Sequence, residues 1–524
     1  MPDIVLTTLN AKFSHAAFGL RYLFANLGEL QPRAVIAEFD INLRPLDIAE
    51  ALLAREPLII GFGIYIWNVT ETTEVITAIR RVRPDIKIIL GGPEVSYETE
   101  GQRIVELADH VITGEADLKF AEVCRTLLGV QASAGPEETP KPANPLPKII
   151  LAEIPEFSRL ALPYDYYTGA DLAHRIVYVE ASRGCPFTCE FCLSSLEIPV
   201  RQVPLDKFLA AMQSLLDRGL KQFKFVDRTF NLNIVTSKAI LEFFLARYQP
   251  GHFYHFEMIP DRLPAELRAI IAKFPPGALQ FEVGIQTFNP EVGTLISRRQ
   301  NYDRLADNFQ YLRRETGVHI HADLIIGLPG ETVQSFATGF DRLIALDPQE
   351  IQVGILKRLR GTPIIRHDQE WQMIYNAHPP YDILQNKLID FATMQRLRRF
   401  AKYWDLIGNS GNFVETTPLL WSNGTPFAGL LRFSDWLYAQ IGRTDTIALA
   451  RLAEKLFEFI TVELNIEKQL AAETLWRDWQ RGARRDPPEF IRSFLPAESL
   501  VRARTAKSGL PKRQARHLAT ETHQ

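Results

Sequence analysis

The stretch RIVYVEASRGCPFTCEFCLSS, residues 175–195, decides how the middle of this chain folds. Its first part, RIVYVEAS, predicts a strand, which leads directly into Cys185, Cys189 and Cys192 in a C-x3-C-x2-C array. Three thiolates on one short loop can bind three irons of a four-iron cluster and leave the fourth iron open to a chelating ligand. A structural zinc site, the alternative, normally has a fourth Cys or His at short spacing, and here the nearest histidine precedes the strand. We therefore expect a [4Fe–4S] cluster on this loop.

Strand-like runs recur on the carboxyl side of the loop, each separated from the next by a helical stretch. These runs are KQFKFVD (221–227), FYHFEMI (253–259), LQFEVGIQ (279–286), HIHADLIIGL (319–328) and IQVGILKRL (351–359). With the first strand they make six β/α units, which favour a partial (β/α)6 barrel of TIM type over residues 171–375.

The chain on the amino side, residues 1–130, also alternates apolar strands with amphipathic helices. This pattern predicts a parallel, doubly wound sheet of the Rossmann-like, flavodoxin-like kind. Such sheets bind ligands beyond the carboxyl ends of their strands. The residues that we expect in one binding mouth there are Asn10, Gly63, Gly91, Gly92 and Gly114.

Three further segments complete the expected domain organisation. Residues 131–170 begin with a Pro- and Ala-rich run without apolar periodicity and are assigned to a linker. Residues 376–510 show amphipathic helices, which we expect either to cover the barrel mouth or to dock a partner. Residues 511–524 are basic and poor in apolar side chains, so we expect a disordered tail.

Composition narrows the class of protein. The 524 residues are 46% hydrophobic and 23% charged with a net charge of −3, which is typical of globular domains and gives no general attraction to nucleic acid or membrane. No signal peptide and no membrane-spanning run is evident, so we expect a cytoplasmic protein. Four cysteines exclude a disulfide framework.

The cysteine array resembles the signature of the radical S-adenosylmethionine (radical SAM) superfamily, C-x3-C-x-aromatic-C, with Phe191 as the aromatic residue. The resemblance implies that the amine and carboxylate of S-adenosylmethionine chelate the open iron. It also implies that one electron, from a donor such as flavodoxin or ferredoxin, cleaves the C5′–S bond to give a 5′-deoxyadenosyl radical.

Two further segments, GIQTFNPEVGTLISRRQ (284–300) and ADLIIGLPGET (322–332), resemble the branch that contains oxygen-independent coproporphyrinogen oxidase and the methylthiotransferases. That resemblance implies S-adenosylmethionine contacts from Glu257, Gln286, Asp323 and, on a helix, Arg298. The family usually has a GGE-like segment after the second strand, whereas this chain has FVDRTFN (225–231). Asp227 is the expected replacement. The alternative is that the carboxylates only cap helices and the arginine lies on a solvated face.

The first domain resembles the cobalamin-binding domain that precedes many radical SAM barrels. The resemblance rests on LIIGFGIYIWNVTETT, ILGGPEVSYE and HVITGEAD; a Rossmann-like domain without a cofactor is the alternative. His15 lies where some corrinoid proteins have a cobalt-ligating D-x-H-x-x-G loop, but Phe13 replaces the aspartate and Gly19 falls one residue late. We therefore favour cobalamin without a histidine ligand.

The whole architecture resembles an uncharacterised class of cobalamin-dependent radical SAM enzymes with a helical C-terminal domain. Family resemblance implies a methyltransferase that acts on an unactivated carbon of an unknown substrate. Alternatives are a radical enzyme for rearrangement or cyclisation without methyl transfer, and a non-catalytic iron–sulfur or corrinoid sensor. A methylthiotransferase is disfavoured because it requires three more cysteines upstream, where this chain has only Cys124.

Overall fold

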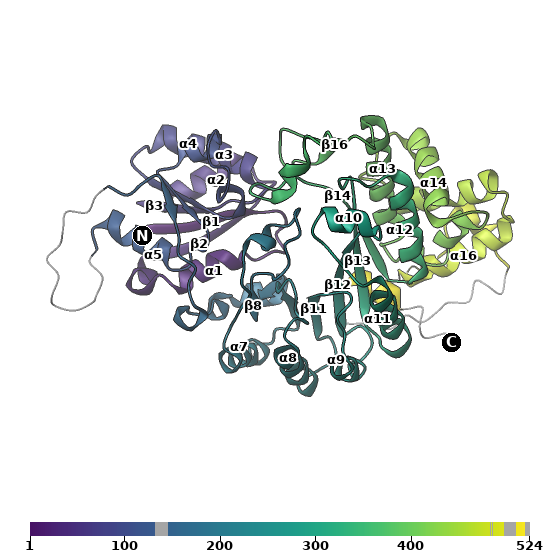
Figure 1. Ribbon diagram of the computed structural model, residues 1–524, viewed down its shortest axis with the longest axis horizontal. Coiled ribbons are helices and arrows are strands. Elements are labelled where there is room, and N and C mark those ends of the chain that lie inside the picture. Colours follow the sequence, from purple (N-terminus) through teal and green to yellow (C-terminus); the bar gives the residue numbers. More distant parts are fainter. Residues whose placement is uncertain (131–144, 483, 485, 497–509, 519–524) are drawn as a thin grey trace.

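A computed structural model describes residues 1–130, 145–482, 484, 486–496 and 510–518. Three parts follow one another along the long axis of the molecule: a sheet with helices on both faces, a larger sheet with helices outside it, and a group of helices (Figure 1). None of the helices in this described part is both long and apolar enough to cross a membrane.

The first sheet is parallel, with strand order β2-β1-β3-β4-β5-β6. Its strands are β1 (Ile4–Asn10), β2 (Ala34–Asp40), β3 (Ile59–Gly63), β4 (Lys87–Gly91), β5 (His110–Thr113) and β6 (Ile149–Leu151). Apolar side chains of α1 (Phe18–Ala25) and α5 (Lys119–Leu128) pack on one face, and those of α2 (Pro45–Leu53), α3 (Val69–Val82) and α4 (Arg103–Leu107) pack on the other. The order of the first five strands is that of flavodoxin, and the expected fold is confirmed.

The edge strand β6 was not foreseen. It lies inside the range 131–170 that we assigned to a linker, and it pairs with β5 through the register Val111↔Ile149 to Thr113↔Leu151. Ile150 buries its side chain against the first sheet, whereas Ile149 and Leu151 are exposed. Three residues give too short an alternation to be recognised in the sequence. The Pro- and Ala-rich part of that range, residues 131–144, lies outside the described residues.

The second sheet contains six parallel strands in the order β14-β13-β12-β11-β10-β7. They are β7 (Val177–Val179), β10 (Gln222–Phe225), β11 (Phe253–Met258), β12 (Leu279–Gln286), β13 (His319–Ile326) and β14 (Glu350–Ile355). The helices between them include α7 (Leu205–Asp217), α8 (Ile234–Ala246), α9 (Ala265–Ile271), α11 (Tyr302–Glu315) and α12 (Val333–Ala345). The predicted partial barrel is confirmed.

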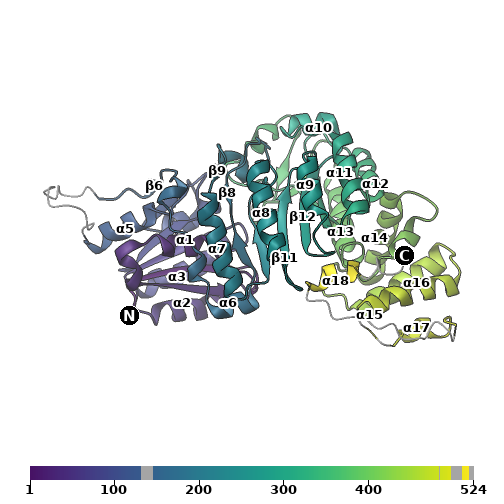
Figure 2. The same ribbon diagram turned by 90° about the horizontal axis from the view of Figure 1, so that it is seen from below.

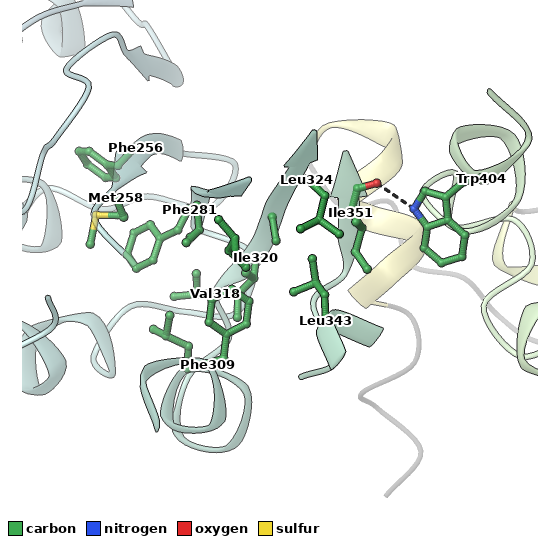
Figure 3. Close-up of a cluster of buried hydrophobic side chains, with 14 of the residues drawn as sticks. Phe256, Met258, Phe281, Phe309, Val318, Ile320, Leu324, Leu343, Ile351 and Trp404 are labelled. Atoms are coloured by element: carbon green, nitrogen blue, oxygen red, sulfur yellow. Dashed lines mark hydrogen bonds between the residues drawn. The ribbon is translucent and has the colours of Figure 1, made fainter. Parts of the chain in front are cut away.

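The barrel is held together by apolar side chains between its strands and outer helices. Phe281 on β12 and Ile320 on β13 belong to the same buried cluster as Phe309 of α11 and Leu343 of α12 (Figure 3). Each of these side chains is at most 1% exposed, so each contributes about 1.5–3 kcal/mol of burial free energy.

The C-terminal helices cover the free edge of this barrel. They include α13 (Phe391–Ile407), α14 (Pro426–Ile441), α15 (Leu449–Glu458) and α16 (Lys468–Arg481). Trp404 on α13 donates its indole N–H to the carbonyl of Ile351 on β14 at 2.8 Å (Figure 3), and Asn409 accepts the N–H of Ile351 at 2.8 Å. Because an edge strand leaves such groups unpaired, the helices have a structural reason to dock there. This position differs from the expected cover over the barrel mouth.

The basic C-terminal segment is partly ordered, so the predicted disordered tail is wrong for residues 512–518. They form α18 (Lys512–Leu518), which lies at the amino ends of the barrel strands (Figure 2). Arg513 contacts Glu350 at 2.9 Å and Gln514 contacts Gln280 at 2.6 Å. The segment is poor in apolar residues, but distant polar groups at the barrel base bind it. Residues 519–524 of the expected tail lie outside the described residues.

Candidate active site

The three clustered cysteines lie on the loop that follows β7 and the two-residue strand β8 (Ser182–Arg183). Cys185 and Cys189 are buried, Cys192 is partly exposed, and all three line one cavity of about 300 Å³. Burial is the main cause that raises the pKa of the Cys185 thiol, so iron binding displaces its proton. Within the described ranges, no three His, Cys, Asp or Glu side chains converge on the position of a single ion. A four-iron cluster takes one cysteine per iron, and the triplet fits that donor arrangement.

Three of the expected ligand-binding residues face the cysteines across the same cavity. Glu257 comes from β11, Gln286 from β12 and Asp323 from β13. Neighbouring strands pair Glu257 with Glu282 and Gly284 with Asp323, so these side chains meet at one edge of the sheet. At Gln286 the register shifts and φ is +72°, a conformation that non-glycine residues rarely adopt. Their role in binding S-adenosylmethionine remains a prediction.

One carboxyl oxygen of Asp323, Oδ1, is buried without a hydrogen-bond partner among the described residues, although His321 Nε2 lies 3.7 Å from it. Burial, followed by the charges of Glu282 and Glu257, raises the pKa of Asp323 well above its usual range. An unpaired buried oxygen in a ligand cavity marks a place where a ligand hydroxyl or amine can donate.

Glu282 is a cavity residue that the sequence analysis missed. Its carboxylate lies 3.0 Å from His255 Nε2. Burial acts to raise its pKa, but the close contact with His255 and the charges of His321 and Lys224 outweigh burial and lower the pKa to about 2. A signal was available, because Glu282 and Gln286 stand four residues apart on the strand and therefore share a face.

Asp227 does not take the position that we expected. Its carboxylate accepts hydrogen bonds from the Ala181 N–H at 3.0 Å and the Ser182 hydroxyl at 2.6 Å, and it is absent from the lining of the cluster cavity. The expectation that it replaces the missing GGE-like segment is therefore corrected. Asp227 fastens the end of β10 to the strand that leads into the cysteine loop.

The next two residues reach the cavity instead. Arg228 binds both carboxylate oxygens of Glu257, at 2.9 and 3.1 Å. Thr229 lines the cavity, and its hydroxyl is buried without a partner among the described residues. A one- or two-residue offset within a loop has no sequence signal, since loop side chains follow no fixed period.

Arg298 and Phe191 also border the cysteine loop. The resemblance placed Arg298 on a helix, but it lies between α10 (Pro290–Leu295) and α11. Its guanidinium donates to Cys189 Sγ at 3.3 Å and to the Gly284 carbonyl. It is therefore held against a cysteine as well as facing the cavity. Phe191 lines the same cavity.

A second cavity, of about 280 Å³, lies at the carboxyl edge of the first sheet. Gly63, Gly91, Gly92 and Gly114 line it, as the sequence analysis predicted, together with Tyr65. Side chains at these glycines would take up space in the cavity; at Gly92 (φ +107°) an added Cβ would also lie 2.4 Å from the Ile64 carbonyl oxygen. A cradle of bare backbone suits a large ligand such as the nucleotide tail of cobalamin.

Asn10 and His15 do not line this second cavity. Asn10 donates to the carbonyl of His15 and to Glu38, both at 3.0 Å, which corrects the expectation that it contacts the cofactor. The His15 ring lies 2.5 Å from the Tyr178 hydroxyl of the barrel. Asn10 therefore holds segments within the first domain together, whereas His15 joins this domain to the barrel.

The segment just before and after the cysteines forms a wall of the second cavity. Arg183 and Glu197 line it, and Arg183 binds Glu115 at 2.7 Å and Asp117 at 2.9 Å in the first domain. The segment that carries the cysteines therefore contributes side chains to both cavities.

Comparison with known proteins identifies both cavity-bearing parts. The model of the radical SAM superfamily matches residues 179–343, and that of the B12 binding domain matches residues 4–124. The fold and site thus define a radical SAM enzyme. More particularly, the chain combines a radical SAM domain with a B12 binding domain. Residues 369–508 match a family described as protein of unknown function (DUF4080). The two matched domains assign an iron–sulfur cluster with S-adenosylmethionine to the barrel and cobalamin to the first domain.

Several known proteins are similar to this chain. The uncharacterized methyltransferase PH0819 of Pyrococcus horikoshii is 26% identical over 66% of this chain and 76% of its own length. The cobalamin-dependent radical SAM methyltransferase TokK of Streptomyces tokunonensis is 23% identical over 59% of this chain and 48% of its own length. The methyltransferase TsrM from Kitasatospora setae, solved with cobalamin and a [4Fe–4S] cluster, has a TM-score of 0.54 at 18% identity and covers 72% of this chain and 76% of TsrM. At that identity the likeness to TsrM concerns the fold.

Proposed function

We propose that this chain is a cobalamin-dependent radical methyltransferase that acts on an unactivated carbon. The observation that carries the proposal is the shared wall: residues 180–197 contribute Cys185, Cys189 and Cys192 to one cavity and Arg183 and Glu197 to the other. A substrate held beside this wall would reach both cofactors. The names of PH0819 and TokK, both methyltransferases, support the type of reaction.

The residues of the chain divide the work between holding the cofactors and orienting them. When bound, the reduced cluster supplies the electron that cleaves S-adenosylmethionine, and cobalamin supplies a methyl carrier. Asp323 and Gln286 would bind the ribose and amine, and Arg298 would hold the methionyl carboxylate beside Cys189. The glycine cradle would hold the corrinoid tail. Radical SAM enzymes need a one-electron reductant, for which we propose flavodoxin or ferredoxin.

The products of S-adenosylmethionine test the proposal. The protein, reconstituted with iron, sulfide and hydroxocobalamin and then reduced, is incubated with S-adenosylmethionine carrying a deuterated methyl group and a small-molecule extract. We expect 5′-deoxyadenosine and S-adenosylhomocysteine together with a deuterium-labelled product. The matched variant Cys189→Ala should lose the cluster and form no 5′-deoxyadenosine, because it lacks one of three iron ligands.

Other outcomes point to the alternatives. Release of 5′-deoxyadenosine without S-adenosylhomocysteine or a labelled product would contradict methyl transfer and favour rearrangement or cyclisation. A loaded, reduced protein that forms neither nucleoside would indicate a sensor.

A further inference from the structure

The chain that leaves the last barrel strand, residues 357–367, returns toward the first domain (Figure 1); we call it the strap. Near its start Arg358 binds Glu98 at 3.1 Å, and Arg360 binds Glu94 at 2.9 Å. Glu94 lies in the short helix η2 (Pro93–Val95), directly after Gly91 and Gly92 of the cobalamin cavity. The strap therefore holds the loop that forms one side of that cavity.

The contact at this end is close as well as charged. The Gly361 N–H donates to Glu98 at 3.1 Å. Gly361 has φ +79°, and a Cβ there would lie 2.4 Å from the ring of Tyr97, so no larger residue fits without movement. Glu94 is only 4% exposed and also accepts a hydrogen bond from the Tyr381 hydroxyl at 2.7 Å.

The other end of the strap binds the cysteine loop at Glu190, which stands between Cys189 and Cys192. The Ile364 N–H donates to the Glu190 carbonyl at 2.9 Å, and His367 Nε2 lies 2.7 Å from the Glu190 carboxylate. Arg366 pairs with the same carboxylate. Glu190 is 1% exposed. Besides these partners from the strap, its carboxylate accepts a hydrogen bond from the Ser297 hydroxyl at 2.8 Å.

We propose that the strap fixes the spacing between the cobalamin-binding loop and the cluster loop, with Arg360 and Glu190 as its positioning residues. A buried charge moves little, because movement would leave it without its partner. Reactions between two held groups are sensitive to displacements of about 1 Å. This inference rests on the proposed function to the extent that both cofactors serve one substrate.

The distance between the two cofactors tests the strap directly. Wild-type protein, Arg360→Gln and Glu190→Gln are loaded with cluster and hydroxocobalamin and reduced until the cluster and Co(II) are both paramagnetic. Pulsed dipolar electron paramagnetic resonance then measures the distance distribution between them. Arg396→Gln serves as the matched control, because Arg396 forms an exposed ion pair with Asp435 in the helical part.

We expect a narrow distribution in wild type and in Arg396→Gln, and a broadened or shifted one in the two strap variants at unchanged corrin content. A narrow, unshifted distribution in Arg360→Gln with both cofactors bound would overturn the proposal. If Glu190→Gln fails to hold its cluster, the distance distribution of Arg360→Gln alone tests the proposal. Wild-type protein that retains no corrin would refute the cobalamin part of the proposed function, and the strap proposal would fall with it. That result is distinct from the one that overturns the strap proposal alone, in which the variants bind both cofactors and keep the wild-type distance between them.

Discussion

Four carboxyl groups line the cluster cavity, those of Glu257, Asp261, Glu282 and Asp323. Their surroundings shift the pKa of three of them, and not all in the same direction. Glu282 stays ionised because His255 lowers its pKa to about 2. Burial raises the pKa of Glu257, although Arg228 acts against that shift. The pKa of Asp323 is raised by burial and by both neighbouring carboxylates. One acidic site therefore offers a fixed negative charge and a carboxyl group that can be neutral, which suits a ligand with both an amine and hydroxyl groups.

Asp323→Asn should weaken S-adenosylmethionine binding about tenfold, or roughly 1.4 kcal/mol, because the amide keeps an acceptor oxygen but cannot become the carboxylate that pairs with the ligand amine. The cluster should remain, because none of the hydrogen bonds or ion pairs described for Asp323 involves a cysteine. Anaerobic equilibrium binding, together with iron and sulfide content, measures both.

Glu331→Gln is the matched control for this substitution. Glu331 is also a buried carboxyl near the end of β13, but it binds Thr287 and Ser335 and does not line the cavity. The affinity of Glu331→Gln for S-adenosylmethionine should equal that of wild type. Equal affinity in Asp323→Asn would mean that the assignment of Asp323 is wrong.

Helix α18 closes the base of the barrel, at the opposite end from the cysteines. It contacts the first or second residue of three strands: Arg513 binds Glu350 of β14, Gln514 binds Gln280 of β12, and the His517 ring lies 5.4 Å from that of His319 on β13. Glu350 also binds His319 at 2.8 Å. Since these groups are buried, the helix keeps water from polar strand ends that would otherwise be exposed.

Removal of residues 510–524 should expose the barrel base. Backbone hydrogen exchange should become faster at the starts of β12, β13 and β14, because local stability depends on the contacts that bury a segment. Mass spectrometry of exchanged peptides measures this. Strand β10 serves as an internal reference, because none of the hydrogen bonds or ion pairs described for α18 reaches it. Removal of residues 519–524 alone is the control. Equal exchange in all three proteins would show that α18 does not seal the base.

The first domain and the barrel meet through buried charges as well as apolar side chains. Arg21 of α1 binds Glu38 at 2.9 Å and Asp171 at 3.0 Å, and Arg175 binds Glu38 at 2.7 Å. Burial acts to raise the pKa of Glu38, but the charge and hydrogen bonds of Arg21 outweigh burial, and the pKa is lowered. The ion network thus joins the segment before β7 to β2 of the first sheet.

Glu38→Gln should destabilise the protein by about 3 kcal/mol near neutral pH, because two arginines lose a buried partner. The folded-state pKa of Glu38 lies below its ordinary value of 4.5. Its contribution is therefore fully present above that pH and is lost as the pH falls below it. Urea unfolding midpoints of both proteins across pH 3–8 measure the difference. The gap between them should close in acid; a gap that is independent of pH would contradict the ionic explanation.

Local patterns determined much of this protein. The cysteine spacing identified the cluster loop, and strand periodicity identified the β/α units of both sheets. The resemblance to known radical SAM enzymes selected Glu257, Gln286 and Asp323, and they lie near the cysteines because parallel strands end at one edge of the sheet. These inferences depend on residues that are close in sequence or on a repeating geometry.

Contacts between distant segments decided the rest. Asp227 turns away from the cavity because its partners, Ala181 and Ser182, lie more than forty residues earlier. Residues 512–518 of the basic tail form a helix because they bind Glu350 and Gln280 at the barrel base. The strap contacts both Glu94 and Glu190, which only the docking of the two domains brings within its reach. A side chain in a loop has no period that fixes its direction. Its orientation follows from the partner that satisfies it, and that partner is brought near only by the tertiary structure.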